Sequence, residues 1–462
     1  MTKKYAAFLA LAFVACTQEK PNQAIDAFWL TKGDKSVLLA PQKIEHSKLE
    51  ESDTPTISVD TTRRYQTMDG FGYSLTGGSA YLLNQKLSKE NRSAILHELF
   101  GSDSTSIGVS YLRVSIGASD LDDHVFSYSE KKDPDLKNFS LAEDEKNLIP
   151  VLKEILAIRP GIKIMGSPWS PPSWMKTNNH AKGGSLKKEF YPVYARYLGL
   201  YIQGMAAAGI TIDAITIQNE PENPNNTPSL LMTAEEQADF IKNHLGPLFA
   251  SENIKTKKVV FDHNCDHPEY PLAILNDADA NKYVDGSAFH MYLGDIGAMG
   301  KVHEQFPDKN LYFTEQWTSG QGDFGGDLQW HIKNLIVGAP RNWSRTVLEW
   351  NLAADPQFNP HTDDGGCTLC LGALTIDNDT VTKNVSYYII AHASKFVPPG
   401  SVRIESSYAD QIPNVAFQTP DGTKVLIALN ETDADKKFTI EQSSLSQPVS
   451  LPAHSVATFT WR

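Results

Sequence analysis

Eight short runs rich in β-branched and aromatic residues recur along the middle of the chain, and stretches with helical periodicity separate them. The runs are residues 68–72, 111–116, 162–166, 214–217, 258–262, 286–290, 311–315 and 345–350. Between them, the spans 141–158, 189–208 and 233–250 place apolar residues at helical spacing. Eight strands that alternate with helices predict an α/β fold of the (β/α)8 TIM barrel type, with long insertions.

The last part of the chain has a different pattern, in which short strands follow one another directly. The runs 415–417, 424–430, 437–440 and 456–461 are separated by turn signals such as Pro420-Asp421-Gly422. This predicts a small antiparallel β-sandwich beside the barrel. We therefore divide the chain into four parts, with a signal peptide at 1–16, a tether and strands that join the sandwich at 17–65, the barrel at 66–397 and the C-terminal sandwich at 398–462.

The first sixteen residues predict a targeting segment. Lys3 and Lys4 precede an apolar stretch, residues 5–15, that is too short to span a bilayer as a helix. The sequence FVAC that ends at Cys16 resembles a bacterial lipoprotein signal, in which the cysteine becomes the acylated N-terminus. An ordinary secretory signal with an incidental cysteine is the alternative. Either predicts export, and the first predicts a lipoprotein of the periplasm, outer membrane or cell surface that meets the membrane only through the lipid anchor at Cys16.

The charge balance bears on possible partners. The chain has 42 Lys and Arg residues against 55 Asp and Glu residues, a net charge of −13. Proteins that bind nucleic acids usually present a basic patch to the phosphate backbone, so we expect no nucleic-acid partner.

Three further cysteines, Cys265, Cys367 and Cys370, bear on metal binding and redox state. Cys367 and Cys370 form a lone C-x-x-C motif, and no second ligand pair stands at the spacing that a zinc site needs. A local disulfide and two free thiols both remain open for this pair in an oxidising compartment. We predict neither a metal nor a cofactor.

Polar and aromatic side chains stand at or just beyond the ends of nearly all the predicted strands. They are Asp120, Trp169, Asn219, Glu220, Asp262, His263, His290, Tyr292, Glu315, Trp317, Trp350 and Asn351. In a TIM barrel the carboxyl ends of all strands open onto one face, and this face carries the active site. Burying a carboxylate such as Glu220 is costly unless something compensates. We therefore expect these side chains to surround a pocket at the mouth of the barrel.

Two carboxylates in one pocket point to glycoside hydrolysis, in which one carboxyl group protonates the leaving oxygen and the other attacks the sugar or activates water. Glu220 and Glu315, from the fourth and seventh strands, form the candidate pair. Taken alone, either residue would be interpreted as a structural glutamate in a hydrogen-bond network. Two other classes stay open: a carbohydrate-binding protein on an inactive barrel, and a metal-dependent hydrolase that uses Asp262, His263 and His290. The second lacks a close ligand pair such as H-E-x-x-H.

The motifs around these residues resemble those of a known family. "TIQNEPE" (216–222) and "LYFTEQW" (311–317) are similar to the acid/base and nucleophile motifs of glycoside hydrolase family 30, the family of glucosylceramidases and β-1,6-glucanases. "LRVSIGASDLD", "GSPWSPPSWMK", "HMYLGD" and "LEWNLAADP" match other motifs of the family in order. The similarity covers residues 28 to 462 and includes the side sandwich. It implies a retaining β-glycoside hydrolase that cleaves β-D-glucosidic bonds.

The resemblance also implies the catalytic roles. Glu220 is the acid/base and Glu315 the nucleophile, with carboxyl groups about 5–5.5 Å apart, as retention requires. Glu220 must be protonated first, so its pKa should be raised, whereas Glu315 must stay charged. Arg113 should lie near Glu315 and keep it ionised, because a nearby cation lowers a carboxyl pKa.

The remaining implied roles concern the sugar. Asn219 should hydrogen-bond the 2-hydroxyl, a contact that strengthens in the transition state. Asp120 and Trp169 should hold the distal hydroxyls. The other implied contacts are His290 and Tyr292, which orient the nucleophile and the sugar ring, and Trp350, which forms part of the pocket wall.

Three departures from the glucosylceramidase pattern bear on the substrate. The turn after the first strand is Gly72 to Gly78 rather than a Gly-Ala-rich turn with an acid, and Trp317 stands where the mammalian lysosomal enzymes have a small residue. Residues 223–227 look more like the β-1,6-glucanases. We therefore expect a β-1,6-glucan or another β-glucoside as substrate. A true glucosylceramidase and a β-xylosidase of the same family are the alternatives.

Overall fold

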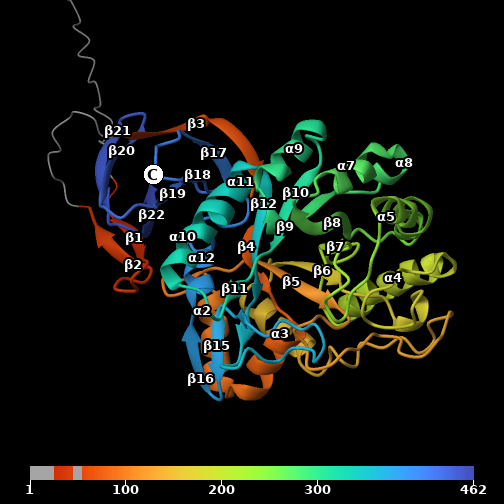
Figure 1. Ribbon diagram of the computed structural model, residues 1–462. Helices are drawn as coiled ribbons and strands as arrows, with labels where there is room; N and C mark the ends of the chain where they lie inside the picture. The colour runs from red at the N-terminus through yellow and green to blue at the C-terminus, as the bar shows by residue number, and fades with distance from the viewer. Residues whose placement is uncertain (1–24, 26, 45–54) are drawn as a thin grey trace, which may run out of the picture.

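A closed barrel of eight parallel strands lies at the centre of the structure, which is a computed structural model (Figure 1). The strands, in hydrogen-bonding order, are β4 (Gly70–Ser74), β5 (Tyr111–Ile116), β6 (Lys163–Pro168), β7 (Ala214–Thr216), β8 (Lys257–Cys265), β9 (Gly286–Gly294), β10 (Asn310–Glu315) and β12 (Ser344–Asn351). β12 pairs with β4 and closes the barrel. The predicted TIM barrel is confirmed.

The structure describes residue 25, residues 27–44 and residues 55–462. The predicted signal peptide, Cys16 and part of the tether lie outside these residues. Within the described part, no helix is both long and apolar enough to cross a membrane.

Side chains fill the inside of the barrel. Each of seven strands contributes one member of a buried layer, and these are Tyr111, Met165, Ala214, Val259, Ala288, Tyr312 and Leu348. The strands are also covered by helices on the outside, so most of their residues are buried. This explains why the strands read as short continuous apolar runs rather than as alternating patterns.

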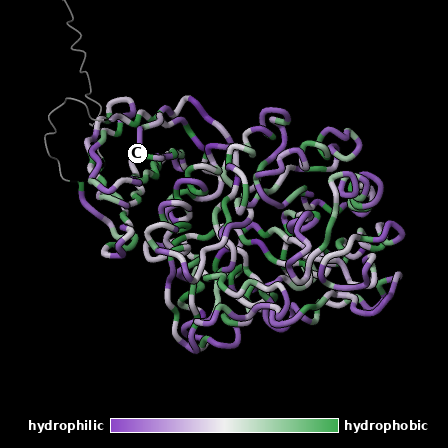
Figure 2. The backbone as a smooth tube through the Cα atoms, viewed as in Figure 1, coloured by the Kyte–Doolittle hydropathy of each residue, from purple (hydrophilic) through white to green (hydrophobic). Residues whose placement is uncertain are grey.

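Helices surround the barrel (Figure 1). The longer ones are α2 (Lys89–Phe100), α3 (Leu148–Ile158), α4 (Tyr191–Ala207), α5 (Ala234–Phe240), α7 (Glu269–Asn276), α9 (Gly297–Gln305), α10 (Phe324–His331) and α12 (Val385–Ser394). Short helical segments are α1 (Gly77–Tyr81), η1 (Leu82–Lys86), η2 (Ser173–Met175), η3 (Lys188–Phe190), η4 (Ile241–Leu245), α6 (Gly246–Ser251), α8 (Ala278–Asn281), η5 (Ile332–Gly338) and α11 (Ala339–Arg341). The outermost loops on the right of the barrel are mostly hydrophilic (Figure 2).

Nine strands form the second unit, in the order β2-β1-β22-β19-β18-β17-β3-β20-β21. They are β1 (Ala27–Lys32), β2 (Ala40–Lys43), β3 (Thr56–Thr67), β17 (Val402–Ser406), β18 (Asn414–Gln418), β19 (Lys424–Asn430), β20 (Lys436–Gln442), β21 (Leu445–Leu451) and β22 (Ser455–Trp461). The segment before the barrel therefore supplies three strands to this unit. The expectation of a purely antiparallel unit is wrong at one pair, β3 with β20. The long strand β3 pairs antiparallel with β17 on one side and parallel with β20 on the other.

Alternation along the sandwich strands joins this unit to the barrel. Ala416, Leu426 and Phe459 face the sandwich's own core. Their neighbours Phe417 and Val425 pack into the same apolar cluster as the helices and strands of the barrel. Because successive strand residues point to opposite faces, one sheet serves both cores.

Short strands complete the loops at the mouth of the barrel. They are β11 (Thr318–Ser319), β13 (Ala353–Ala354), β14 (Cys370–Leu371), β15 (Leu374–Asp377) and β16 (Thr380–Lys383). β11 pairs with β14, and β13 with β15.

Candidate active site

A fully buried arginine, Arg113 of β5, connects the strand ends at the mouth of the barrel. Its Nη1 donates to Glu315 Oε2 at 2.6 Å. Its Nη2 lies within hydrogen-bonding distance of Asn219 Oδ1 at 2.7 Å, Asp262 Oδ2 at 2.8 Å and Ser167 Oγ at 3.1 Å. The four partners come from four different strand ends, so one side chain fixes the relative positions of residues that lie far apart in the sequence.

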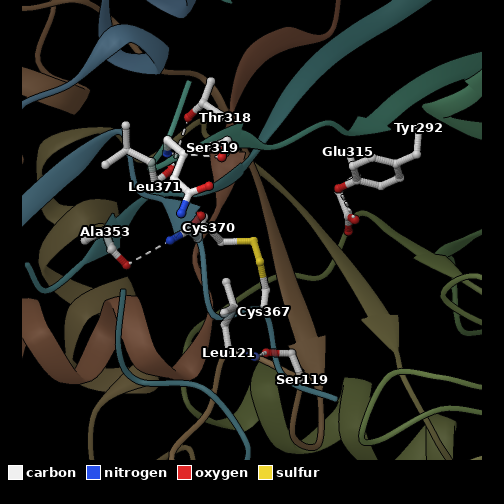
Figure 3. Close-up of a disulfide and its surroundings, with 12 residues drawn as sticks. Ser119, Leu121, Tyr292, Glu315, Thr318, Ser319, Ala353, Cys367, Cys370 and Leu371 are labelled. Atoms are coloured by element: carbon white, nitrogen blue, oxygen red, sulfur yellow. Dashed lines mark hydrogen bonds between the residues drawn. A yellow bond between two sulfur atoms is a disulfide. The ribbon is translucent and has the colours of Figure 1, made fainter. Parts of the chain in front are cut away.

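Glu315, the last residue of β10, has both carboxylate oxygens held. Arg113 contacts Oε2, and the hydroxyl of Tyr292 donates to Oε1 at 2.8 Å. Tyr292 stands on β9, and Figure 3 shows its ring turned towards Glu315. The carboxylate is thus fixed in one orientation inside the barrel mouth.

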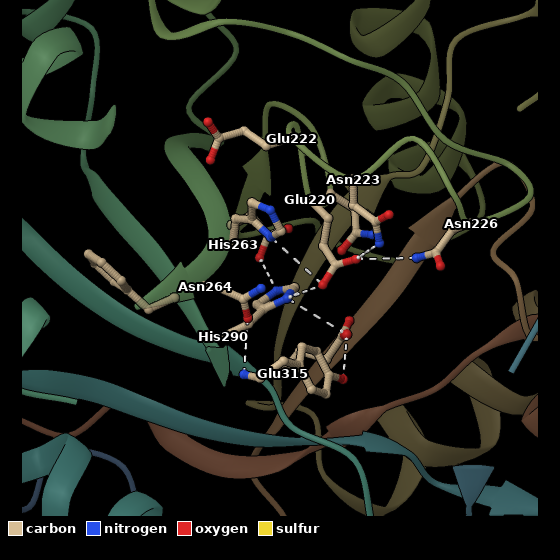
Figure 4. A network of polar contacts seen from close by, with 12 residues as sticks. Glu220, Glu222, Asn223, Asn226, His263, Asn264, His290 and Glu315 are labelled. Carbon is tan, nitrogen blue, oxygen red and sulfur yellow. Dashed lines mark hydrogen bonds and ion pairs between the residues drawn. The ribbon is translucent and has the colours of Figure 1, made fainter. Parts of the chain in front are cut away.

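Glu220 follows β7 on a backbone with φ of +44°, a left-handed conformation that costs a residue with a side chain about 1–2 kcal/mol. Two backbone contacts hold this turn: Asn219 N donates to Pro168 O at 2.8 Å, and Glu220 N donates to Asp262 O at 3.0 Å. Its Oε2 accepts from Asn223 at 2.8 Å and from Asn226 at 3.2 Å (Figure 4). These contacts compensate the buried carboxylate, which explains how a strand can run directly into it.

His290 lies between the two glutamates. Its Nδ1 is 3.2 Å from Glu220 Oε1 and 3.7 Å from Glu315 Oε1, and its Nε2 is 3.1 Å from Asp262 Oδ1 (Figure 4). Because one nitrogen contacts both carboxylates, their oxygens are separated by no more than the sum of the first two distances. The sum is an upper limit on the distance between the two oxygens, and it lies close to about 6.5 Å, the smallest carboxyl separation in inverting enzymes. The geometry therefore favours the shorter separation of about 5–5.5 Å that retaining enzymes have.

The electrostatics differ from the expectation that Glu220 has a raised pKa. Burial alone would raise the pKa of Glu220, but His290, His263 and Asn223 stabilise its charged form and lower that pKa to about 2. Burial raises the pKa of Glu315 above its usual value, and the nearby His290 and Arg113 offset this only in part. Burial would lower the pKa of His290, but the charges of Glu315, Asp262 and Glu220 raise it to about 9. The proton of this cluster therefore resides on His290, between the carboxylates.

Asp120 lies on the same face with a carboxyl group that no other described residue hydrogen-bonds. Burial, together with the charges of Glu315 and Glu220, raises the pKa of Asp120 to about 8. A buried carboxyl group without a protein partner is a candidate contact for a polar ligand.

Two stacked tryptophans form a wall beside Arg113. The rings of Trp169 and Trp350 are 5.4 Å apart, and the Arg113 guanidinium lies 4.8 Å and 5.8 Å from their centres. Trp169 Nε1 is buried without a hydrogen-bond partner among the described residues. Trp317 is half-buried and packs against this pair. The structure thus gathers all ten sequence-predicted site residues at the barrel mouth.

Sequence reasoning placed Asp262 and His263 at the pocket without giving them a role in glycoside hydrolysis, and it did not identify Asn223 and Asn226 as contacts. Asp262 bonds Arg113, His290, Ser167 and Thr314, and is fully buried. His263, Asn223 and Asn226 surround Glu220. The position of Asp262 and His263 at and just beyond the end of the run 258–262 indicates that they lie at the barrel mouth. The two asparagines lie in a loop, and only the proximity of that loop to Glu220 indicates them.

One group among the described residues has the donor atoms of a metal site. Possible ligand atoms of Glu220, His263 and His290 lie within 4.8 Å of one another. Two of the three already have protein partners, because Asn223 and Asn226 bond Glu220 and Asp262 bonds His290. The absence of a metal from the chemistry stays a prediction.

Comparison with known proteins decides the family. Residues 68–397 match the sequence model of the glycosyl hydrolase family 30 TIM-barrel domain, and residues 400–459 match that of the family 30 β-sandwich domain. The chain belongs to glycoside hydrolase family 30. It is therefore a β-glycoside hydrolase, from a family in which retention of configuration is typical.

Individual members of family 30 agree with this assignment. The chain is 33% identical over 438 residues to an endo-1,6-β-D-glucanase of Aspergillus fumigatus, covering 88% of this chain and 87% of that one. It is 29% identical to the lysosomal acid glucosylceramidase of Mus musculus, covering 88% and 83%. The solved structure of the endo-β1,6-glucanase BT3312 superposes with a TM-score of 0.88 at 35% identity, over 95% of this chain and 99% of that one.

Proposed function

We propose that this family 30 enzyme hydrolyses β-1,6-linked glucan by double displacement, with Glu220 as the acid/base and Glu315 as the nucleophile. The observation that carries the proposal is the single nitrogen of His290 that contacts both carboxylates. It keeps the two groups near the spacing at which one attacks the sugar carbon while the other protonates the leaving oxygen.

In the first step, Glu315 attacks the anomeric carbon while Glu220 protonates the departing sugar oxygen. The required proton starts on His290, whose Nδ1 is 3.2 Å from Glu220 Oε1. When Glu220 accepts the proton, it becomes competent as the acid. The negative charge of Glu220, which raises the pKa of Glu315, and the positive charge of His290, which lowers it, are then neutralised together, so Arg113 and the Tyr292 hydroxyl remain to stabilise the ionised nucleophile.

In the second step, Glu220 removes a proton from water, and the oxygen of that water displaces Glu315 from the sugar. Arg113 and Tyr292 lie 2.6 Å and 2.8 Å from the carboxylate oxygens of Glu315 and are in place to receive the carboxylate when its bond to the sugar breaks. These donors stabilise the leaving carboxylate without having to reorganise.

Three polar groups remain for recognition of the sugar. The Oδ1 atom of Asn219 accepts from Arg113, so its amide nitrogen, which no described residue hydrogen-bonds, is available to donate to the 2-hydroxyl. The unpartnered Trp169 Nε1 and the carboxyl group of Asp120 take distal hydroxyls. Trp350 packs beside the sugar ring, and Trp317 narrows the site.

The choice of β-1,6-glucan rests on the relatives. Two similar proteins, at 33% and 35% identity over most of both chains, carry the name endo-β-1,6-glucanase, whereas the similar glucosylceramidase is 29% identical. The −13 net charge also disfavours an anionic substrate. In a β-1,6-glucan the leaving group is the primary hydroxyl of the next sugar, and its departure requires a proton, which Glu220 supplies.

We also propose that the enzyme acts outside the cytoplasm as a lipoprotein anchored through Cys16. The support is the sequence pattern of residues 1–16 alone. Labelling of the expressed full chain with a fatty-acid analogue tests this. Label should enter the wild type and be lost in Cys16→Ala, and equal labelling of both would overturn the anchor.

A substrate panel tests the proposed activity. We expect β-1,6-glucan to be hydrolysed at least ten-fold faster than β-1,3-glucan, β-1,4-linked gluco-oligosaccharides, aryl β-xyloside and glucosylceramide. Proton NMR in the first minutes should show the β-anomer as the initial product. Faster hydrolysis of glucosylceramide or xyloside would contradict the substrate, and an initial α-anomer would contradict the mechanism.

A further inference from the structure

A segment that we call the mouth strap, residues 355–371, leads from β13 to the end of β14 and crosses the barrel mouth. It contains a disulfide between Cys367 and Cys370, whose Cα atoms are 5.6 Å apart (Figure 3). The chemical steps proposed above use no residue of this segment.

Contacts of the mouth strap tie together three loops at the mouth. Thr362 N donates to Asp120 O at 3.0 Å, in the loop after β5. The Thr362 hydroxyl donates to Thr227 O at 2.7 Å, in the loop that follows Glu220. Lys182, in the loop after β6, donates to Asp364 at 2.8 Å. The mouth strap thus fixes the backbone of Asp120, a candidate sugar contact, and the backbone of the loop that follows Glu220.

The far end of the mouth strap is joined to the loop that carries the nucleophile. Cys370 pairs with Ser319 and Leu371 with Thr318 in the β11–β14 ladder, and Gly320 N donates to Leu369 O at 2.8 Å. β11 begins three residues after Glu315. The ladder thus joins Cys370 to Thr318 and Ser319, whereas the carboxylate of Glu315 is held by Arg113 and Tyr292, which lie outside the mouth strap.

The disulfide itself belongs to the tryptophan wall. Cys370 is buried in a cluster with Leu121, Trp169 and Trp350, and half-buried Cys367 and Trp317 pack against that cluster. Close packing leaves no slack here, because a Cβ atom on Gly366 would lie 2.9 Å from Asp120 O. The sulfur atoms are thus a part of the surface on which Trp169 and Trp350 rest.

We propose that the Cys367–Cys370 disulfide is a positioning element that holds Asp120 and the tryptophan wall in shape to bind the sugar at the cleavage site. This rests on the proposed function, because it assigns the wall to sugar binding. A disulfide that closes so short a loop constrains little of the unfolded chain, so its main effect is on local shape rather than on global stability. The wall contacts the sugar before and during reaction, so its loss weakens substrate and transition-state binding alike.

Reduction by dithiothreitol tests the proposal. One thiolate of dithiothreitol attacks a cysteine sulfur, forms a mixed disulfide and releases the other cysteine as a thiolate. The second thiolate of dithiothreitol then attacks the reductant's own sulfur in the mixed disulfide and releases the remaining cysteine, so the protein gains two thiols and dithiothreitol becomes its cyclic disulfide. We expect KM for nitrophenyl β-glucoside and for β-1,6-linked gluco-oligosaccharides to rise at least five-fold, with kcat within two-fold. Alkylation followed by mass spectrometry reports the redox state of the pair.

Variants separate the mouth strap from other effects of reductant. The Cys367→Ser/Cys370→Ser enzyme should show the raised KM without reductant and no further change with it. Cys265→Ala, which removes the buried free cysteine, should keep the wild-type KM and its response to reductant. Thermal unfolding of oxidised and reduced wild type checks that the fold persists on reduction. If the double variant does not fold, the comparison of KM between oxidised and reduced wild type decides the test.

The outcomes are distinct. An unchanged KM on full reduction of the wild type would overturn the positioning role, as would an equal rise in KM when the double variant meets reductant. An oxidised wild type that cleaves no β-glucoside would instead contradict the proposed function.

Discussion

The two ends of the barrel both carry buried charge, but they balance it differently. At the amino-terminal end, Asp69 accepts from Arg345 Nε and Nη2 at 3.0 Å each and from Lys163 Nζ at 2.8 Å. Burial would raise the pKa of Asp69, but these two cations outweigh burial and lower it. One carboxylate with two cations is a stable arrangement.

At the mouth, carboxylates outnumber cations. Glu220, Asp262 and Glu315 share Arg113 and His290, and the carboxyl group of Asp120 has no cation beside it in the described residues. The pKa values of Asp120, Glu315 and His290 are raised and that of Glu220 is lowered. Trp169 Nε1 and His263 Nδ1 are buried without a hydrogen-bond partner in the described part of the chain. A layer of apolar side chains separates the two ends. The difference shows that the mouth is built at the expense of stability, as expected of a catalytic face.

The largest expected effect follows removal of the nucleophile. Glu315→Gln keeps the shape of the side chain but cannot form a glycosyl-enzyme, so kcat/KM on aryl β-glucosides should fall about 10⁴-fold or more. The melting temperature should not fall, because a buried carboxylate of raised pKa is removed. Steady-state kinetics and calorimetry measure the two. Residual activity above one hundredth of wild type would contradict the role of Glu315.

The opposite end should respond in the opposite way. Asp69→Ala leaves Arg345 and Lys163 without their carboxylate, and we expect a loss of about 2 kcal/mol of stability. The value of kcat/KM should stay within two-fold of wild type, since the apolar layer lies between this site and the mouth. Urea unfolding and initial rates provide the measurements. A large fall in activity with unchanged stability would remove the distinction between the two ends.

The pH dependence of stability sharpens the comparison further. The pKa of Asp120 is about 8 in the folded protein, well above the ordinary 3.8, so the native state retains a proton that the unfolded chain releases. The stability associated with this group is complete below pH 3.8 and is lost as pH rises towards 8. Asp120→Asn should therefore gain on the order of 4 kcal/mol over wild type at pH 8 relative to pH 5.

Asp69 provides a control, because its pKa is shifted in the opposite direction to that of Asp120. Its pKa is lowered, so its contribution is present above pH 3.8 and is lost as pH falls below it. Asp69→Asn should lose stability at both pH 5 and pH 8. Urea unfolding at the two pH values measures both variants. Equal effects of Asp120→Asn at the two values would contradict the assigned pKa direction.

The fold was predictable because its signal is local and repeated. The runs 111–116 and 311–315 match β5 and β10 within one residue, since parallel strands covered on both faces are continuous apolar runs. The span 141–158 was too long at its start, because the mostly polar residues 142–147 form turns and the apolar face of α3 begins at Leu148. The direction of β20 relative to β3 depends on pairing between distant segments, which no local pattern contains.

The site was predictable where strand ends carry the chemistry, as at Glu220 and Glu315. Asp262 was expected at the pocket, but the only role assigned to it was in a rival metal site, because its contacts depend on backbone geometry. Phe261 and Asp262 have φ of +74° and +65°, and the β8–β9 register shifts at this point. Such a bulge re-aims a side chain, and alternation along the strand does not predict it. The state of Cys367 and Cys370 was also open, and the structure has them bonded.

Azide rescue tests the division of roles between Glu220 and Glu315 most directly. Both Glu220→Ala and Glu315→Ala should be assayed with dinitrophenyl β-glucoside, whose leaving group needs little protonation, with and without azide. We predict that Glu220→Ala accumulates the glycosyl-enzyme, and that azide restores turnover and yields β-glucosyl azide, while Glu315→Ala yields only the α-azide or none. A β-azide from Glu315→Ala, with none from Glu220→Ala, would show that the two roles are reversed.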